Sequence, residues 1–134
     1  MEHEVVIKKK VTDDDLICVL SGSLTGCAYW CNEIDYNQDE YSEAKINLIR
    51  EKKLNASEVC YEDVLLQMLK EGKKVSYYDV EEEEYKDLTL DKLLQAIGKH
   101  IASGNATDTD MDCWDDTDYD SVIQYALYDD VIYG

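Results

Sequence analysis

Cysteine and histidine are the side chains in this sequence best suited to hold a metal ion. Cys27 and Cys31 are separated by three residues, so their thiols project from the same side of the chain in either a helix or a strand. Zinc in proteins usually takes four sulfur, nitrogen or oxygen ligands. We therefore predict a structural zinc site that joins these two cysteines to Cys113, with His100 or an aspartate as the fourth ligand.

The cysteines have an alternative role as ordinary apolar side chains. Cys18 and Cys60 fall on the apolar faces of predicted helices, and a reduced cysteine behaves in a core as a small apolar residue. Cys27 and Cys31 can be buried in the same way. The odd number of cysteines, five, and an N-terminal segment without an apolar signal-peptide core favour a reducing, cytoplasmic location.

Segment 108–120 is the second chemical feature, because seven of its thirteen residues are aspartate. Aspartates at this density approximate the charge spacing of a nucleic-acid backbone, and Trp114 and Tyr119 are aromatic residues of the kind that anchor protein interfaces. We predict that the segment binds a basic protein surface; an ordinary solvated loop is the alternative. The predicted partner-binding residues are Asp108, Asp110, Asp112, Trp114, Asp115, Asp116, Asp118 and Asp120.

The same segment resembles the start of an EF-hand calcium loop but does not complete one. Asp108, Asp110 and Asp112 match the first three ligand positions. The sixth position should be glycine and is Cys113, and the twelfth should be a bidentate glutamate and is Tyr119. Only weak calcium binding by the aspartates is left open.

The charge of the chain restricts the class of partner. Thirty-one acidic and thirteen basic residues give a net charge of −18. Residues 101–134 contain nine aspartates and no lysine or arginine, so this part carries −9, half of the total. A negative field of this kind argues against direct binding to nucleic acid or to an anionic membrane. It favours a basic protein surface.

The sequence does not predict an enzyme. A cysteine nucleophile needs a histidine nearby in space, and the only histidines are His3 and His100. No glycine-rich phosphate loop, nucleophile elbow or zinc-protease motif occurs in the chain. A small metalloenzyme, a cysteine-dependent redox protein and a protein that sequesters a nucleotide signal are the alternatives to a binding role.

Hydrophobic periodicity predicts the elements that must position these residues. We expect helices over 13–26, 42–54, 57–70 and 90–103, the first capped by Thr12 or Asp13 and the fourth capped by Thr89. A last helix should start at Asp118 or Asp120. Strands are expected over 4–8, 74–80 and 85–88, with a buried element over 28–36, a polar loop over 37–41 and a β-like tail over 131–134 that can pair with the hairpin.

The predicted elements define one domain over residues 1–134. Its fold class is α+β, with about four helices packed on a small, mainly antiparallel sheet. The length of the chain is typical of one domain with a single hydrophobic core.

Three short stretches resemble small proteins of phage and prophage genomes. They are Tyr29-Trp30-Cys31 after the first helix, Leu88–Leu94 after the hairpin, and Val122–Leu127 with the ending Val131–Gly134. The resemblance covers most of the chain from Asp13 onward. Some such phage proteins resemble anti-CRISPR proteins, which inhibit the RNA-guided nuclease of type II systems, and at least one kind is thought to hold zinc.

This resemblance implies an acidic inhibitor in the cytoplasm of an infected or lysogenic host cell. Such a protein would dock on a basic surface of the nuclease and block the loading of target DNA. Only Cys31, within the Tyr-Trp-Cys word, is carried over as a matched position.

Overall fold

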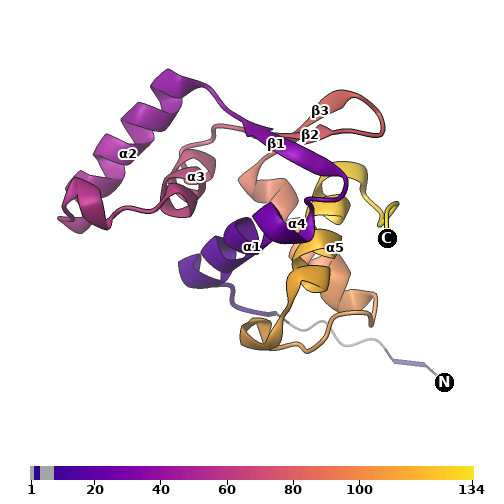
Figure 1. Ribbon diagram of the computed structural model, residues 1–134. Helices are drawn as coiled ribbons and strands as arrows, with labels where there is room; N and C mark the ends of the chain where they lie inside the picture. Colours follow the sequence, from indigo (N-terminus) through magenta and orange to yellow (C-terminus); the bar gives the residue numbers. More distant parts are fainter. Residues whose placement is uncertain (1, 4–7) are drawn as a thin grey trace.

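The computed structural model describes residues 2–3 and 8–134, and within them the chain forms five α-helices and one three-stranded antiparallel sheet (Figure 1). The α+β class is therefore confirmed, with five helices rather than about four. The five helices correspond to those expected over 13–26, 42–54, 57–70 and 90–103 together with the expected last helix, and Lys53 in a left-handed conformation ends α2. The helices are α1 (Asp13–Gly26), α2 (Gln38–Lys52), α3 (Tyr61–Lys70), α4 (Leu90–Ala102) and α5 (Asp116–Tyr128).

The sheet has the strand order β1-β2-β3 and presents two different faces. Its strands are β1 (Cys31–Asp35), β2 (Val75–Asp79) and β3 (Glu84–Leu88). Val75, Tyr77 and Asp79 alternate along β2 and are buried, whereas Ser76 and Tyr78 are only partly buried. The period-two pattern of this strand thus places one face on the core, as expected of a half-buried sheet.

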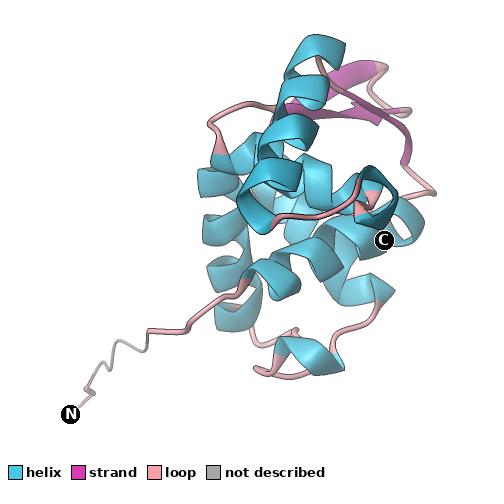
Figure 2. Cartoon of the chain, turned by 90° about the vertical axis from the view of Figure 1, so that its left-hand side faces the viewer, coloured by secondary structure: helices cyan, strands magenta, loops and turns pink. Residues whose placement is uncertain are grey.

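Helices α1, α4 and α5 lie below the sheet in Figure 1, and all five helices contribute buried residues to the core. Helix α5 packs against both α1 and α4, and α2 packs on α3 at the other side of the molecule. Figure 2 shows the sheet at the top of the molecule, with helices below it and in front of it. Among the described helices, none combines the length and apolar character needed to cross a bilayer.

Two glycines let α1 and α5 approach each other closely. A Cβ atom at Gly22 would lie 2.1 Å from the ring of Tyr119, and one at Gly26 would lie 2.5 Å from the carbonyl oxygen of Asp116. Only glycine leaves room for these contacts. Their spacing of one helical turn places both on the same side of α1, where they fix the first turns of α5 against the helix.

The prediction of a polar loop over 37–41 is wrong, because most of this segment is helical. Asn37 is the N-cap of α2, and its side chain accepts a hydrogen bond from the backbone N–H of Glu40. Residues 38–41 therefore belong to the helix. An acidic first turn containing Asp39 and Glu40 favours this earlier start, because carboxylates stabilise the positive end of the helix dipole.

Other boundaries also differ from the predictions. Helix α3 begins at Tyr61 rather than at residue 57, after a short 3-10 helix over Ala56–Glu58. Helix α5 is capped by Asp115 rather than by Asp118 or Asp120. The expected strand over 4–8 falls almost entirely outside the described residues. The expected helix over 13–26 and its cap Thr12 agree with the structure.

The C-terminal tail is extended but does not join the sheet. Instead, the backbone N–H groups of Ile132 and Tyr133 both donate to Oε1 of Gln124, at 2.8 Å. The ring of Tyr133 stacks on Trp30 at a centroid distance of 5.7 Å. The tail was expected to hydrogen-bond to the hairpin. The buried side-chain amide of Gln124 accepts its backbone N–H groups instead.

Candidate interaction surface

The acidic segment forms a loop and the start of a helix, and the structure divides its side chains into two groups. Five carboxylates are exposed, and three of the predicted contact residues are buried. The exposed residues, which define the acidic loop (residues 108–116), are Asp108, Asp110, Asp112, Asp115 and Asp116. The buried ones are Trp114, Asp118 and Asp120. Of the predicted contact surface, the five exposed aspartates of the acidic loop are therefore accessible to a partner.

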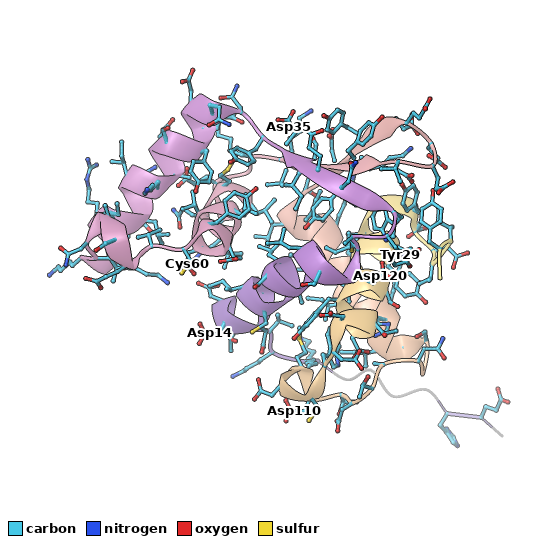
Figure 3. The ribbon with its side chains drawn as sticks, viewed as in Figure 1. Asp14, Tyr29, Asp35, Cys60, Asp110 and Asp120 are labelled. Carbon is cyan, nitrogen blue, oxygen red and sulfur yellow. The ribbon has the colours of Figure 1, made fainter. Side chains whose placement is uncertain are left out.

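Aspartate side chains bend the acidic loop back on itself. Oδ1 of Asp108 accepts the backbone N–H of Asp110 at 3.0 Å, and Oδ1 of Asp110 accepts that of Asp112 at the same distance. Trp114 closes the turn, because its indole N–H donates to the carbonyl of Asp108 at 2.7 Å. Short polar side chains commonly form such local turns. The loop thus has a defined shape, with carboxylates on its outside (Figure 3, Asp110).

Asp118 anchors the acidic loop from below and is only 1 % exposed. Its carboxylate accepts hydrogen bonds from His100 Nε2 at 2.8 Å and from the backbone N–H groups of Thr107 and Asp115, both at 3.0 Å. Burial by itself raises the pKa of Asp118, but these hydrogen bonds outweigh it and hold the pKa at about 2. The bond to Asp115 also completes a capping box at the start of α5.

His100 is part of this anchor. Its ring is 2 % exposed and lies edge-on to Trp114, with centroids 5.2 Å apart. Nε2 hydrogen-bonds to Asp118, and Nδ1 is buried without a hydrogen-bond partner among the described residues.

Asp120 makes a second anchor, between α5 and the turn that precedes β1. Its carboxylate accepts the hydroxyl of Tyr29 at 2.5 Å, the indole N–H of Trp30 at 2.7 Å and the amide of Gln124 at 2.9 Å. Tyr29 and Asp120 lie side by side in Figure 3. The Tyr-Trp-Cys stretch that stood out in the sequence therefore binds the acidic segment through its first two residues.

Sequence reasoning missed a third buried carboxylate, Asp79 at the end of β2. It accepts the hydroxyls of Tyr128 and Tyr133, the latter at 2.7 Å, and the backbone N–H groups of Glu81 and Glu82. Although burial raises the pKa of Asp79, these bonds lower it overall. A signal was available, because the strand pattern places Asp79 on the same face as Val75 and Tyr77.

The structure does not bring the four predicted zinc ligands together. Cys27 and Cys31 share one turn, where the backbone N–H of Cys31 donates to the carbonyl of Cys27 at 2.8 Å, and both are buried. Cys113 is instead exposed on the acidic loop, and His100 is bonded to Asp118. Nowhere in residues 2–3 and 8–134 do three or more His, Cys, Asp or Glu side chains form a group that could hold a metal ion.

The expectation that Cys18 and Cys60 belong to the core is wrong, since both are exposed. Cys18 lies on the outer side of α1, and Cys60 precedes the first turn of α3 as its N-cap. For Cys27, burial and the neighbouring carboxylate of Asp120 raise the pKa strongly, and burial also raises that of Cys31. Desolvation and nearby aspartates raise the pKa of Cys113. A raised pKa keeps a thiol protonated and therefore weakly nucleophilic.

Comparison with known proteins adds no relative: the chain matches no family profile, no curated protein and no solved structure.

Proposed function

We propose that this protein is a non-catalytic binding protein that docks through its acidic loop on a basic protein surface. The observation that carries the proposal is the presentation of five exposed carboxylates on a loop held in shape by hydrogen bonds to the buried side chains of Trp114 and Asp118. None of the five forms a salt bridge with a described lysine, arginine or histidine. Their charge is therefore available to a partner, and a pre-shaped loop loses less entropy on binding.

We further propose that the partner is a type II RNA-guided nuclease and that binding blocks the loading of target DNA. This finer proposal rests on the resemblance to anti-CRISPR proteins and on the charge of the loop. Such a nuclease holds nucleic acid in a positively charged channel, and a row of carboxylates can compete for the same lysine and arginine side chains. The predicted structural zinc stands as a separate proposal, because this one does not depend on a metal ion.

The alternatives have less support from the residues. A cysteine-dependent redox protein or metalloenzyme needs an accessible thiolate or an open metal site, whereas burial raises the pKa of Cys27 and Cys31. A protein that sequesters nucleotides must bind phosphate, and the charge of −18 opposes that.

Replacing Asp112 and Asp116 with asparagine tests the role of the loop. Neither side chain makes a hydrogen bond within the described part of the chain, so the double variant should fold normally. A panel of guide-loaded type II nucleases would be incubated with each protein, and retention of target DNA would be measured by gel shift. We expect inhibition to weaken about two- to tenfold at low salt and the difference to shrink in high salt.

The matched control changes two exposed carboxylates of α2, Asp39→Asn and Glu43→Gln, which removes the same charge elsewhere. Inhibition that is equal in the loop variant and the wild type would overturn the loop as the contact. Failure of the wild type to inhibit any nuclease would overturn the finer proposal. Affinity capture from host lysate followed by mass spectrometry would then show whether the acidic loop selects a different basic protein.

A further inference from the structure

Strand β1 leaves one edge of the sheet open. It pairs with β2 along one side, through Ile34 opposite Tyr77 and Asp35 opposite Ser76, and no other described strand lies on its far side. The register is irregular between Cys31 and Glu33, so the regular part of the free edge runs from Glu33 to Asp35. A free edge of this kind offers backbone N–H and C=O groups to an added strand.

A cavity of about 440 Å³ lies beside this edge. Its walls combine β1 with the end of α1 and the start of α3: Leu24, Ala28, Cys31, Ile34 and Tyr61 all line it. Leu24 is 40 % exposed, so it presents apolar surface to the cavity. The volume falls within the range of ligand pockets and is ample for apolar side chains of a partner.

The same edge also carries negative charge. Glu33 and Asp35 are exposed and two positions apart, so their side chains project from the same side of β1. Glu33 pairs with the partly buried Tyr78 and Ile34 with the buried Tyr77, and Glu33 and Ile34 both line the cavity. Glu33 accepts a hydrogen bond from the Tyr85 hydroxyl at 2.9 Å. Neither carboxylate is paired with a described lysine, arginine or histidine.

From these three features we infer that β1 binds an extended segment of a partner in which basic and apolar residues alternate. The backbone of that segment adds a fourth strand next to Glu33–Asp35. Its lysine or arginine side chains, two residues apart, face Glu33 and Asp35, and the apolar residue between them enters the cavity beside Leu24 and Ala28. This inference deepens the proposed binding function and shares with it the assumption of a basic partner.

The second contact is separate from the acidic loop. Asp35 lies at the upper margin of the molecule in Figure 3, whereas Asp110 lies at the lower margin. The two surfaces can therefore be tested independently. If both are used, a partner must reach around the molecule or bind it with two segments.

Two synthetic hexapeptides, blocked at both ends, test the inference on the full chain. Both contain three lysines and three valines, one in strict alternation and the other in two blocks. In ¹⁵N-NMR titrations, we expect the alternating peptide to shift the amides of Glu33, Ile34 and Asp35 together with those of Leu24 and Ala28. The block peptide should bind about tenfold more weakly, because only one peptide matches charge and cavity at once.

Two variants separate the parts of the site. Ala28→Trp fills the cavity from an exposed position, and Glu33→Lys with Asp35→Lys reverses the charge of the edge. Each variant should bind the alternating peptide about tenfold more weakly than the wild type does. The control, Glu43→Lys with Glu51→Lys on the exposed side of α2, makes the same change in net charge and should leave the affinity unchanged.

The inference would be overturned if the wild type bound the two peptides equally well. It would also be overturned if both the Ala28→Trp variant and the Glu33→Lys, Asp35→Lys variant bound the alternating peptide with wild-type affinity. Shifts confined to Asp108–Asp116 would overturn it as well, although that result would support the acidic loop as the docking surface. The opposite result combines two observations: peptide binding is lost in the cavity and charge variants, and the Asp112 and Asp116 variant inhibits the nuclease as well as the wild type. That result would support the β1 site and overturn the acidic loop as the docking surface. The two proposals can thus fail separately.

Discussion

Buried aspartates are the residues on which the shape of the acidic segment depends. A carboxylate that accepts three hydrogen bonds inside a protein is stabilised in its charged form, and its removal leaves several donors unsatisfied. Asp118 and Asp120 each have three such donors, drawn from segments far apart in the chain, such as Tyr29 and Asp120, which are 91 positions apart. The same residue type therefore has two roles here, outward charge and inward anchor.

Asp118→Asn should destabilise the fold by about 1–3 kcal/mol, because the amide presents N–H groups to donors that need an acceptor. The low pKa of Asp118 gives the effect a pH dependence. Folding lowers this pKa from an ordinary value of about 4, so its contribution to stability is complete above about pH 4. It is lost as the pH falls through that value toward a pKa of about 2.

Urea unfolding of both proteins at neutral pH and near pH 3 checks this prediction. The difference between wild type and variant should be largest at neutral pH and smaller in acid. Asp116→Asn is the control, since it removes a charge from the same helix turn without removing a hydrogen bond. A difference that stays constant with pH, or a control that is equally destabilised, would contradict the role given to Asp118.

Part of this site could be predicted from sequence and part could not. The density of aspartate located the acidic segment, and the exposed residues Asp108, Asp110 and Asp112 agree with a solvent-facing loop. The inward turn of Asp118 and Asp120 depends on donors from Thr107, Tyr29 and Trp30, which only the fold brings close. For the cysteines, spacing showed that Cys27 and Cys31 share a side, but it could not show where Cys113 lies.

At the scale of elements, the contact between α1 and α5 depends on glycine. In the sequence, Gly22 and Gly26 are unfavourable for a helix, since glycine costs about 1 kcal/mol relative to alanine in a helix interior. The structure gives the reason that local rules miss: both positions touch α5. Helix boundaries were predictable where a capping residue was distinctive, as at Thr12 and Thr89, and not where several aspartates competed, as at Asp115.

Gly26→Ala should destabilise the protein by about 1–3 kcal/mol, because its Cβ would meet the backbone carbonyl of Asp116, which cannot rotate away. Gly98→Ala is the matched control. Gly98 lies within α4 with nothing within 4 Å of a Cβ atom, so alanine should stabilise that helix by about 0.5–1 kcal/mol. Thermal melting monitored by circular dichroism measures both. Equal effects of the two substitutions would refute the close approach of α1 and α5.

At the scale of the molecule, the chain separates its charge from its core. A continuous apolar core links all five helices to one face of the sheet, while the acidic loop and the β1 edge carry unpaired carboxylates at opposite margins. The α+β class followed from the alternation along 74–80 and the helical spacing along 90–103, which both agree with the structure. The packing of α5 between α1 and α4 involves segments far apart in the chain, so hydrophobic periodicity could not predict it.

Metal content is a property of the whole protein and tests the zinc prediction directly. Because the described residues contain no group of three or more potential metal ligands, we expect protein purified without added metal to hold less than about a tenth of an equivalent of zinc. Elemental analysis by mass spectrometry provides the measurement, with Cys31→Ser as the comparison. Stoichiometric zinc that disappears in this variant would restore the predicted metal site.

The packing of α1 on α5 also has a consequence for how the chain folds. Helix α1 is made before α5, the helix that covers its glycines, and a long stretch of chain separates the two. Contacts between distant segments are slow to form, because the intervening chain must lose entropy before they stabilise it. We expect α4 and α5 to associate first and α1 to dock last. The carboxylates of the acidic loop would thus acquire their final shape only after α5 has been made and α1 has docked on it, so a nascent chain that lacks α5 has little capacity to bind a partner.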